Sequence, residues 1–428
     1  MTPKVSVILT SYNKSQTVGK AIESVLRQTM QEWELFIMDD ASNEETNTII
    51  KKYTDDNRIH YFNSNIADHD RYRKTRYAVL INQAIPLTTG KYLSYLTDDT
   101  EYLPTRLNEM ANFLDNHSNI DVAYSGQIIR QVNGELKLIS QKTRKTKGIL
   151  KKAANRVDHC SVMHSRKIVE KVFQKHRSYW DDNPKYWHNG DAAFWSRLNE
   201  FQPFYPIPKE LDISYKTPSS FQNLNAFLPQ KVPDGILVKG LASEVYLIDQ
   251  QKRRLITEEM FKRLKYDRKR IVAVPDPVLF KYPPGPLIDV SIFKNGTIPN
   301  QLLVKVENSS DIFYIQNNKK WKLLDRRTFK KFNFKFEDVV DLKKKELEHI
   351  PEGPLIDHIL SPKKNLPDGI IFKEGSSYFL SNNNTLQPTN SNILKKLKLP
   401  VNQFVKLTKT ERLFIKKGKP LIFEIFQN

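Results

Sequence analysis

Three strand-like runs in the first hundred residues end in polar or acidic side chains, and this pattern restricts the fold more than any other feature. Each run is mostly apolar, so it predicts a strand buried on both faces of a parallel sheet. The runs and the residues that follow them are Val5–Thr10 with Ser11, Tyr12 and Asn13, Trp33–Met38 with Asp39 and Asp40, and Lys91–Thr97 with Asp98 and Asp99. Ligands of open α/β sheets bind outside the carboxyl ends of the strands, so we expect these polar groups at one sheet edge.

Helical periodicity fills the gaps between the runs. Residues 18–28 repeat apolar side chains at the spacing of an amphipathic helix, and residues 44–53 and 72–84 are predicted to be helical as well. Shorter strands are predicted at 58–62 and, beyond the third run, at 160–163. Strand, helix and strand in this order call for right-handed parallel crossovers. The predicted fold of residues 1–222 is therefore α/β.

The adjacent carboxylates of Asp98 and Asp99 allow two interpretations. Two neighbouring acids repel one another unless a cation lies beside them, and a divalent metal with oxygen ligands satisfies that need. Acid pairs are also common in surface turns after strands. The residues alone leave both possibilities open.

The bulk composition fits a globular protein of two or three domains. The chain has 428 residues, of which 39% are hydrophobic, so cores can be buried. Its single cysteine, Cys160, excludes an internal disulfide and fits a reducing compartment. No run of eighteen apolar residues predicts a membrane span, and the N-terminal residues read as a first strand instead of a signal peptide. We therefore expect a cytoplasmic protein.

The net charge of +20 is spread unevenly along the chain. Residues 1–220 contribute +5 and residues 221–428 contribute +15. A basic surface favours polyanionic partners, such as an anionic wall or coat polymer or nucleic acid, although a lysine-rich exterior also serves solubility alone.

Several stretches resemble one enzyme family. Residues 5–13, Phe36–Asp40 and Thr97–Asp99 are similar to the nucleotide-binding signature of the inverting family 2 glycosyltransferases, which have the GT-A fold. Asp158–His164, Ser178–Asp181, Gly190–Asp191 and Phe201–Pro206 are similar to the members of that family that build spore coat polysaccharide in bacilli. The resemblance covers about residues 1–220 and implies a UDP- or dTDP-sugar donor and a polysaccharide or glycan acceptor.

The resemblance also implies roles for the nucleotide-binding residues. Asp39 would accept a hydrogen bond from the uracil or thymine ring, with Thr10, Ser11 and Tyr12 around the base. Arg71 stands where the family has a basic residue near the nucleotide, although a solvated basic helix face explains the neighbouring cations equally well.

On the reaction side, the resemblance makes Asp99 the direct ligand of Mn²⁺ or Mg²⁺, and it places Asp98 near the ribose or a metal-bound water. Asp191 would be the general base that deprotonates the acceptor, and Asp158 and His159 would lie on the acceptor side. Without the resemblance, Asp191 reads as a helix N-cap. The basic segment 141–148 is predicted to be a loop over the acceptor groove or plain solvated surface.

Residues 230–428 contain a self-similar unit of about 66 residues. Pro233–Lys239, Pro299–Lys305 and Pro367–Lys373 match one another, which gives three predicted repeats at 230–296, 297–364 and 365–428. Each repeat reads as β-rich with one short helix. None contains a cluster of acids, histidines or serines suited to catalysis, so we interpret the repeats as binding or scaffolding modules.

Two functional hypotheses follow. The first is a metal-dependent inverting glycosyltransferase that acts on a spore coat or cell-surface polysaccharide. The alternative is a wall-binding structural protein with a vestigial transferase domain. A nucleic-acid-binding function would depend on charge alone and is not favoured.

Overall fold

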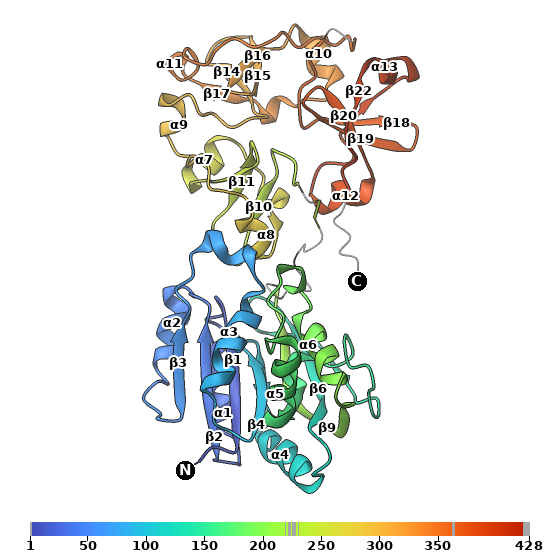
Figure 1. Cartoon of the computed structure of the whole chain (residues 1–428). Coiled ribbons are helices and arrows are strands. Elements are labelled where there is room, and N and C mark those ends of the chain that lie inside the picture. Colours follow the sequence, from blue (N-terminus) through green and yellow to red (C-terminus); the bar gives the residue numbers. More distant parts are fainter. Residues whose placement is uncertain are drawn as a thin grey trace. The chain divides into compact units, whose positions relative to one another are not determined.

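The computed structural model describes residues 2–218, 220, 224, 228–229, 231–361 and 364–422 (Figure 1). The chain separates into two compact units, Met1–Asn223 and Leu224–Asn428. The domain limits predicted at 222, 230 and 428 fall on positions outside the described residues.

The first unit is built on one nine-stranded sheet. Its strand order is β3-β2-β1-β4-β8-β6-β9-β5, and β7 pairs with β6 off this path. The strands are β1 (Val5–Ser11), β2 (Trp33–Asp39), β3 (Ile59–Asn63), β4 (Tyr92–Thr97), β5 (Thr100–Tyr102), β6 (Val122–Val132), β7 (Leu138–Arg144), β8 (Val162–Ser165) and β9 (Tyr205–Lys216).

The first four strands are parallel, as the apolar runs predict. Every residue of β1 and β2 is buried, and β-branched and aromatic side chains fill both faces. In the register, Ser11 lies beside Asp39 and Thr10 lies beside Thr97. The carboxyl ends of β1, β2 and β4 therefore meet at one edge.

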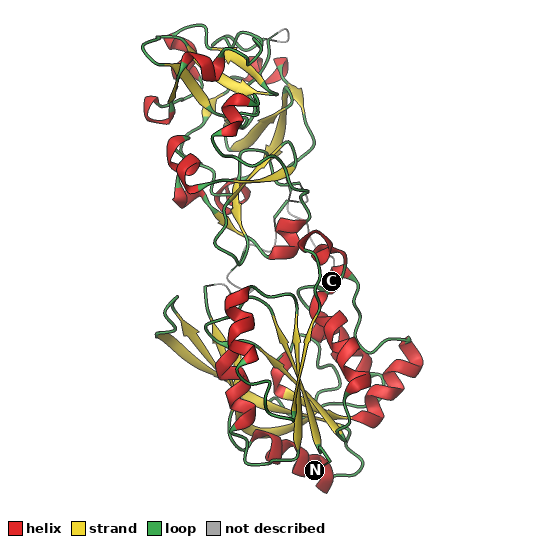
Figure 2. Cartoon of the chain, turned by 90° about the vertical axis from the view of Figure 1, so that its left-hand side faces the viewer, coloured by secondary structure: helices red, strands yellow, loops and turns green. Residues whose placement is uncertain are grey.

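Helices cover both faces of this sheet (Figure 2). The helices are α1 (Val18–Leu26), α2 (Glu44–Lys51), α3 (Arg76–Ala84), α4 (Arg106–Asn116), α5 (Arg166–His176) and α6 (Gly190–Asn199). Buried side chains of α1, α2 and α4 pack with Val7 and Leu9 of β1, whereas those of α3, α5 and α6 pack with Ile8. Because neighbouring residues of a strand point to opposite faces, these two clusters are the two sides of the sheet.

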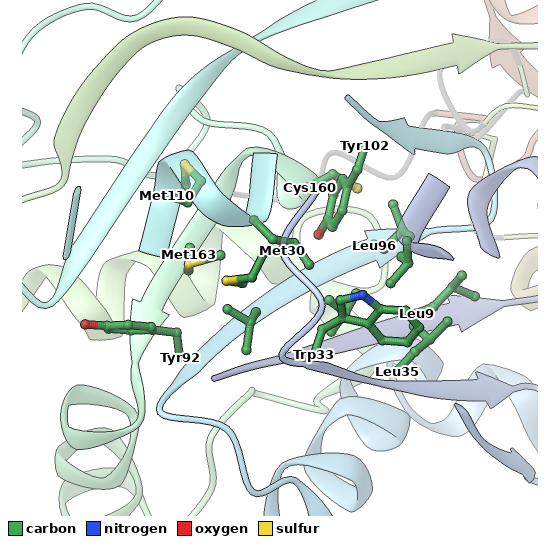
Figure 3. Packing of buried hydrophobic residues seen from close by; sticks show 14 of the residues in the cluster. Leu9, Met30, Trp33, Leu35, Tyr92, Leu96, Tyr102, Met110, Cys160 and Met163 are labelled. Atoms are coloured by element: carbon green, nitrogen blue, oxygen red, sulfur yellow. The ribbon is translucent and has the colours of Figure 1, made fainter. Parts of the chain in front are cut away.

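Aromatic and sulfur-containing side chains fill the core on the α1 face (Figure 3). Trp33 lies near Leu9 and Leu35, and Met110 and Met163 lie farther along the same layer. Cys160 belongs to this core as a buried free thiol. Burial raises the pKa of that thiol above its ordinary value, so Cys160 is a packing residue and not a nucleophile.

Three predicted segments differ from the structure. Residues 72–84 do not form one helix, because a short 3-10 helix, η1 (Asp68–Arg73), precedes α3. Another 3-10 turn, η3 (His159–Ser161), occupies the start of the strand predicted at 160–163. The segment predicted as a loop at 141–148 contains the second half of β7, which pairs with β6 in continuous register from Ser140 to Arg144.

Within its described residues, the second unit contains three small sheets with a common plan. In each, a central strand pairs antiparallel with a hairpin and parallel with a later strand. The sheets are β10 (Leu237–Lys239), β11 (Tyr246–Asp249), β12 (Lys252–Leu255) and β13 (Val272–Ala273); β14 (Leu303–Val306), β15 (Ile312–Gln316), β16 (Lys319–Lys322) and β17 (Val340–Leu342); and β18 (Ile371–Glu374), β19 (Ser377–Asn382), β20 (Thr385–Thr389), β21 (Val405–Lys406) and β22 (Lys416–Lys417). The helices are α7 (Glu258–Arg263), α8 (Asp276–Phe280), α9 (Ser291–Lys294), α10 (Arg326–Lys331), α11 (Lys344–Leu347), α12 (Ser391–Lys396) and α13 (Lys409–Phe414).

The three sheets share their cores. Each of the three hydrophobic clusters of this unit draws its side chains from two of the sheets. The side chain of Gln301, which precedes β14, packs against the turns that precede β10 and β18. A Cβ atom added to Gly235 or Gly369 in those turns would come within 2.2 Å of Gln301 Oε1. Both glycines have positive φ, so glycine suits these turns sterically and conformationally. We therefore expect the second unit to unfold as one body.

We predict that a fragment of residues 1–222 folds without the rest of the chain and binds nucleotide. Its hydrophobic clusters consist of residues between Val5 and Tyr215, so the fragment retains its complete core. A single cooperative thermal transition, with a melting temperature that rises on addition of Mn²⁺ and UDP or dTDP, is the expected result. Aggregation of the fragment, or loss of nucleotide binding that the full chain retains, would show that the second unit is integral to the first.

Candidate active site

The centre of the candidate site is the turn between β4 and β5, which consists of Asp98 and Asp99. Asp98 is buried, and the backbone N–H of Tyr12 donates to its Oδ2 at 2.7 Å. Asp99 is partly exposed and accepts a hydrogen bond from Thr97 Oγ1 at 2.8 Å. The first-strand residues and the acid pair predicted from the sequence are therefore in direct contact.

The acid pair has the electrostatics of a cation site. Burial and the repulsion from Asp99 raise the pKa of Asp98 to about 7, and Lys14 acts against them. Among the described residues, no group of three or more His, Cys, Asp or Glu side chains could hold a metal. Two carboxylates with remaining positions filled by phosphate and water are, however, the usual protein share of a Mg²⁺ site, so the pair fits such an ion.

Asp39 lies at the end of β2 and is fully buried. Asn63 Nδ2 donates to its Oδ2 at 2.7 Å, and the Tyr61 hydroxyl and the Ser42 backbone N–H each donate at 3.3 Å. Burial raises the pKa of Asp39, and the hydrogen bonds from Ser42 and Tyr61 act in the opposite direction. Asp39 is thus held in a fixed orientation beside Ser11.

Arg71 is buried, and its side-chain nitrogens are occupied by oxygens of the protein. Nη1 donates to Asp40 Oδ2 and Nη2 to the Asp40 carbonyl, both at 2.6 Å, while Nε donates to Asp68 at 3.0 Å. Its guanidinium lies 4.1 Å from the centre of the Tyr12 ring. The position is near the predicted nucleotide site, but the contacts indicate that Arg71 orients Tyr12 and Asp40.

Asp191 lies in the first turn of α6, after Asn189 at the N-cap, so it is not itself the N-cap. Gly190 precedes it, and a Cβ at that position would come within 2.6 Å of the Tyr77 hydroxyl. That hydroxyl accepts a hydrogen bond from the Gly190 N–H at 2.7 Å, which fixes the start of the helix. Nothing in the sequence pattern indicates Tyr77.

A helix N-terminus by itself would stabilise the Asp191 anion and lower its pKa, but other groups outweigh that effect. Burial and the nearby charge of Asp158 raise its pKa to about 6, and backbone N–H groups and Arg144 only partly offset them. This value suits a general base better than an ordinary aspartate value does, because proton transfer is most efficient near the working pH.

Asp158 and His159 start the η3 turn on the same side of the site. Arg144 Nη1 donates to Asp158 at 2.9 Å; burial raises the pKa of Asp158, but the cations Lys216 and Arg144 outweigh it and lower that pKa. Burial lowers the pKa of His159 to about 4 against the charges of Asp158 and Asp99, so the imidazole is neutral at neutral pH. Its buried Nε2 has no hydrogen-bond partner within the described part of the chain.

Three aromatic residues, Tyr179, Trp180 and Trp187, precede Asp191 in the sequence, and an aromatic ring there could stack on a sugar. Two of the three belong to the core. Tyr179 and Trp180 are buried on the α6 face of the sheet, and Trp180 stacks on Phe194 with 4.5 Å between ring centres. Trp187 is partly exposed and lies edge-on to His188. Only Trp187 of these three remains a candidate for contact with a sugar.

Comparison with known proteins agrees with this geometry. Residues 6–173 match the model of the family described as glycosyl transferase family 2. The chain is 44% identical over 398 residues to Protein CgeD of Bacillus subtilis (strain 168), with 92% of this chain and 91% of that protein covered. The chain belongs to glycosyl transferase family 2. It is accordingly a glycosyltransferase, and the predicted α/β transferase fold followed by a β-rich region is confirmed.

Other relatives match this family 2 glycosyltransferase over shorter lengths. The putative glycosyltransferase EpsE of Bacillus subtilis (strain 168) is 34% identical over 127 residues, which is 30% of this chain and 44% of EpsE. Among solved structures, S. aureus TarS 1-349 in complex with UDP-GlcNAc has a TM-score of 0.39 at 16% identity, covering 50% of this chain and 58% of that one. Within the described residues, no helix is long and apolar enough to cross a membrane.

Proposed function

We propose that this glycosyltransferase moves a sugar from a UDP- or dTDP-sugar to a spore coat or other cell-surface polysaccharide, with inversion and with Mn²⁺ or Mg²⁺ held by Asp99. The observation that supports the proposal most is the convergence of Tyr12, Asp39 and Asp98 at one sheet edge, with the Tyr12 N–H bonded to Asp98. A partly enclosed acid pair beside a polar strand end is suited to a nucleoside diphosphate and its cation.

On the donor side, each residue has a task that its contacts allow. Asp39 would accept from the imide N–H of the base, and Thr10, Ser11 and Tyr12 would surround the ring. Asp98 would contact the ribose or a metal-bound water. A divalent cation, when bound, neutralises charge on the departing diphosphate. Arg71 would act indirectly, by holding the Tyr12 ring and Asp40.

On the acceptor side, Asp191 would remove the proton of the attacking hydroxyl. One base suffices for inversion, since the hydroxyl attacks as the leaving group departs from the opposite face. The neutral His159 and the ionised Asp158 would orient the acceptor next to it. The second unit would bind or scaffold an anionic wall or coat polymer through its basic surface.

The test is the melting temperature of the full chain with Mn²⁺ or Mg²⁺ and with UDP, dTDP or GDP. A ligand that binds only the folded state raises the free energy of unfolding, by about 2.7 kcal/mol at a hundredfold excess over its dissociation constant. We expect stabilisation that requires both metal and either UDP or dTDP. Absence of any metal-dependent shift with every nucleotide would instead support a vestigial transferase domain.

A further inference from the structure

Strand β7 forms a basic edge beside the acceptor side of the site. All seven of its residues are exposed, and it pairs antiparallel with β6. Neither strand contains an acidic residue. All the charged side chains of these two strands are therefore cationic, and a local excess of cations attracts anions.

The register shows which cations face the site. Arg144 lies opposite Gln127 and Lys142 opposite Ile129, while on the other side of β6 Lys216 of β9 lies opposite Gln131. Paired residues, and residues two apart in a strand, share a face of the sheet. Lys142, Arg144 and Lys216 therefore share one face.

That face also contacts the acids of the acceptor side. Arg144 is bonded to Asp158, and Lys216 acts on the same carboxylate. Gln127 Nε2 donates to Asp212 at 2.6 Å, and Ser161 Oγ also donates to Asp212. The hydrogen bonds of this buried acid are therefore made within the protein. The charged groups around the face include the acids Asp158, Asp191 and Asp212, the three cations, and Arg106, whose charge acts on Asp212.

Two of the three cations lack a fixed counter-ion. Arg144 is held by Asp158, whereas neither Lys142 nor Lys216 forms an ion pair within the part of the chain that the structure describes. Lys142 is exposed and Lys216 half-buried. Each ammonium is a compact charge with three donors, which suits a phosphate or carboxylate oxygen.

We infer that the acceptor glycan contains an anionic group, a phosphodiester or a carboxylate, and that Lys142 and Lys216 bind it next to the hydroxyl that receives the sugar. The inference rests on the proposed function, because it takes Asp158 and Asp191 as the acceptor side. The two lysines offset the repulsion that these acids exert on an anionic acceptor, and Arg144 remains with Asp158.

Lysine acetylation mapped by mass spectrometry tests this site in the full chain. The probes are a glycerol phosphate tetramer, a galacturonate tetramer and neutral maltotetraose. We expect one of the anionic tetramers to slow acetylation of both Lys142 and Lys216 at least about threefold, and maltotetraose to slow neither. The exposed Lys137, at the other end of β7 and bonded to Glu135, is the internal control. Protection of the two lysines by the glycerol phosphate tetramer indicates a phosphate-bearing acceptor, and protection by the galacturonate tetramer indicates a carboxylate-bearing one.

A double variant provides the second measurement. Lys142→Gln with Lys216→Gln should weaken binding of the protecting tetramer about tenfold, whereas Lys137→Gln with Lys51→Gln, of equal charge change, should alter it less than twofold. Absence of protection by both anionic tetramers, equal protection by maltotetraose, or equal weakening by the two double variants would overturn the inference. Metal-dependent stabilisation by UDP or dTDP in the same preparation separates the two claims: if it persists, only the anionic acceptor is wrong.

Discussion

Sugar transfer by the Asp191→Asn variant is expected to fall by two to four orders of magnitude, the usual contribution of a positioned general base. Asparagine keeps the size of the side chain but cannot accept the proton. The affinity for donor should be unchanged, because the proposal assigns Asp191 to the acceptor hydroxyl and not to the nucleotide; the charges that act on it are those of Asp158 and Arg144. The measurement is the turnover rate with saturating donor, beside calorimetric titration of UDP or dTDP.

The raised pKa of Asp191 gives this prediction a pH dependence. A base must be ionised, so wild-type transfer should decline as the pH falls through about 6, the pKa of Asp191. Ionisation of Asp191 lowers the free energy of unfolding, whereas ionisation of an ordinary ion-paired aspartate raises it. A folded pKa above the ordinary value means that ionisation opposes folding at neutral pH. Asp191→Asn should therefore leave the free energy of unfolding at pH 7 unchanged or raise it, by about 1 kcal/mol at most.

Asp182→Asn is the matched control, since Asp182 is a partly exposed acid whose side chain bonds to Lys74. It should retain transfer within about twofold, as surface substitutions usually do. Near-normal transfer by Asp191→Asn would show that Asp191 is not the base, and Asp158 would then be the next candidate.

The second large effect is expected for Asp99→Ala. This variant should lose metal-dependent nucleotide binding, so that UDP or dTDP affinity in Mn²⁺ falls about a hundredfold, to the level measured without metal. The fold should remain, because the side chain of Asp99 bonds only to Thr97 in the described structure, and its carbonyl still accepts from Tyr215. Asp55→Ala, at an exposed position, is the control. Unchanged UDP and dTDP affinity in Asp99→Ala would remove the metal assignment.

The parallel half of the sheet could be predicted because its strands are buried on both faces. Such strands appear in the sequence as continuous apolar runs, and β1 and β2 have no exposed residue. Strand β7 could not be predicted in the same way. Its seven exposed residues have no hydrophobic pattern, and its pairing with β6 depends on backbone hydrogen bonds that any sequence can make.

In the site, too, residues at predicted strand ends could be identified from the sequence, whereas contacts between residues far apart in the chain could not. The apolar runs predicted that the ends of β1 and β4 lie at one sheet edge, whereas the contact of Tyr12 with Asp98 also requires that these two strands pair directly. The contacts of Arg71 with Asp40 and of Tyr77 with Gly190 join residues 31 and 113 positions apart, and no spacing rule in one sequence indicates them. The shift of Asp191 to a higher pKa has the same origin, because burial and Asp158 outweigh the local effect of the helix terminus.

Hydrogen exchange measured by mass spectrometry on the full chain, with and without Mn²⁺ and UDP or dTDP, tests the central claim most directly. The account predicts that the nucleotide slows exchange at residues 10–13, 39–42 and 97–100 together, and only when the metal is present. Protection confined to other parts of the chain, or none at saturating ligand, would contradict the assignment of the donor site to this edge of the sheet.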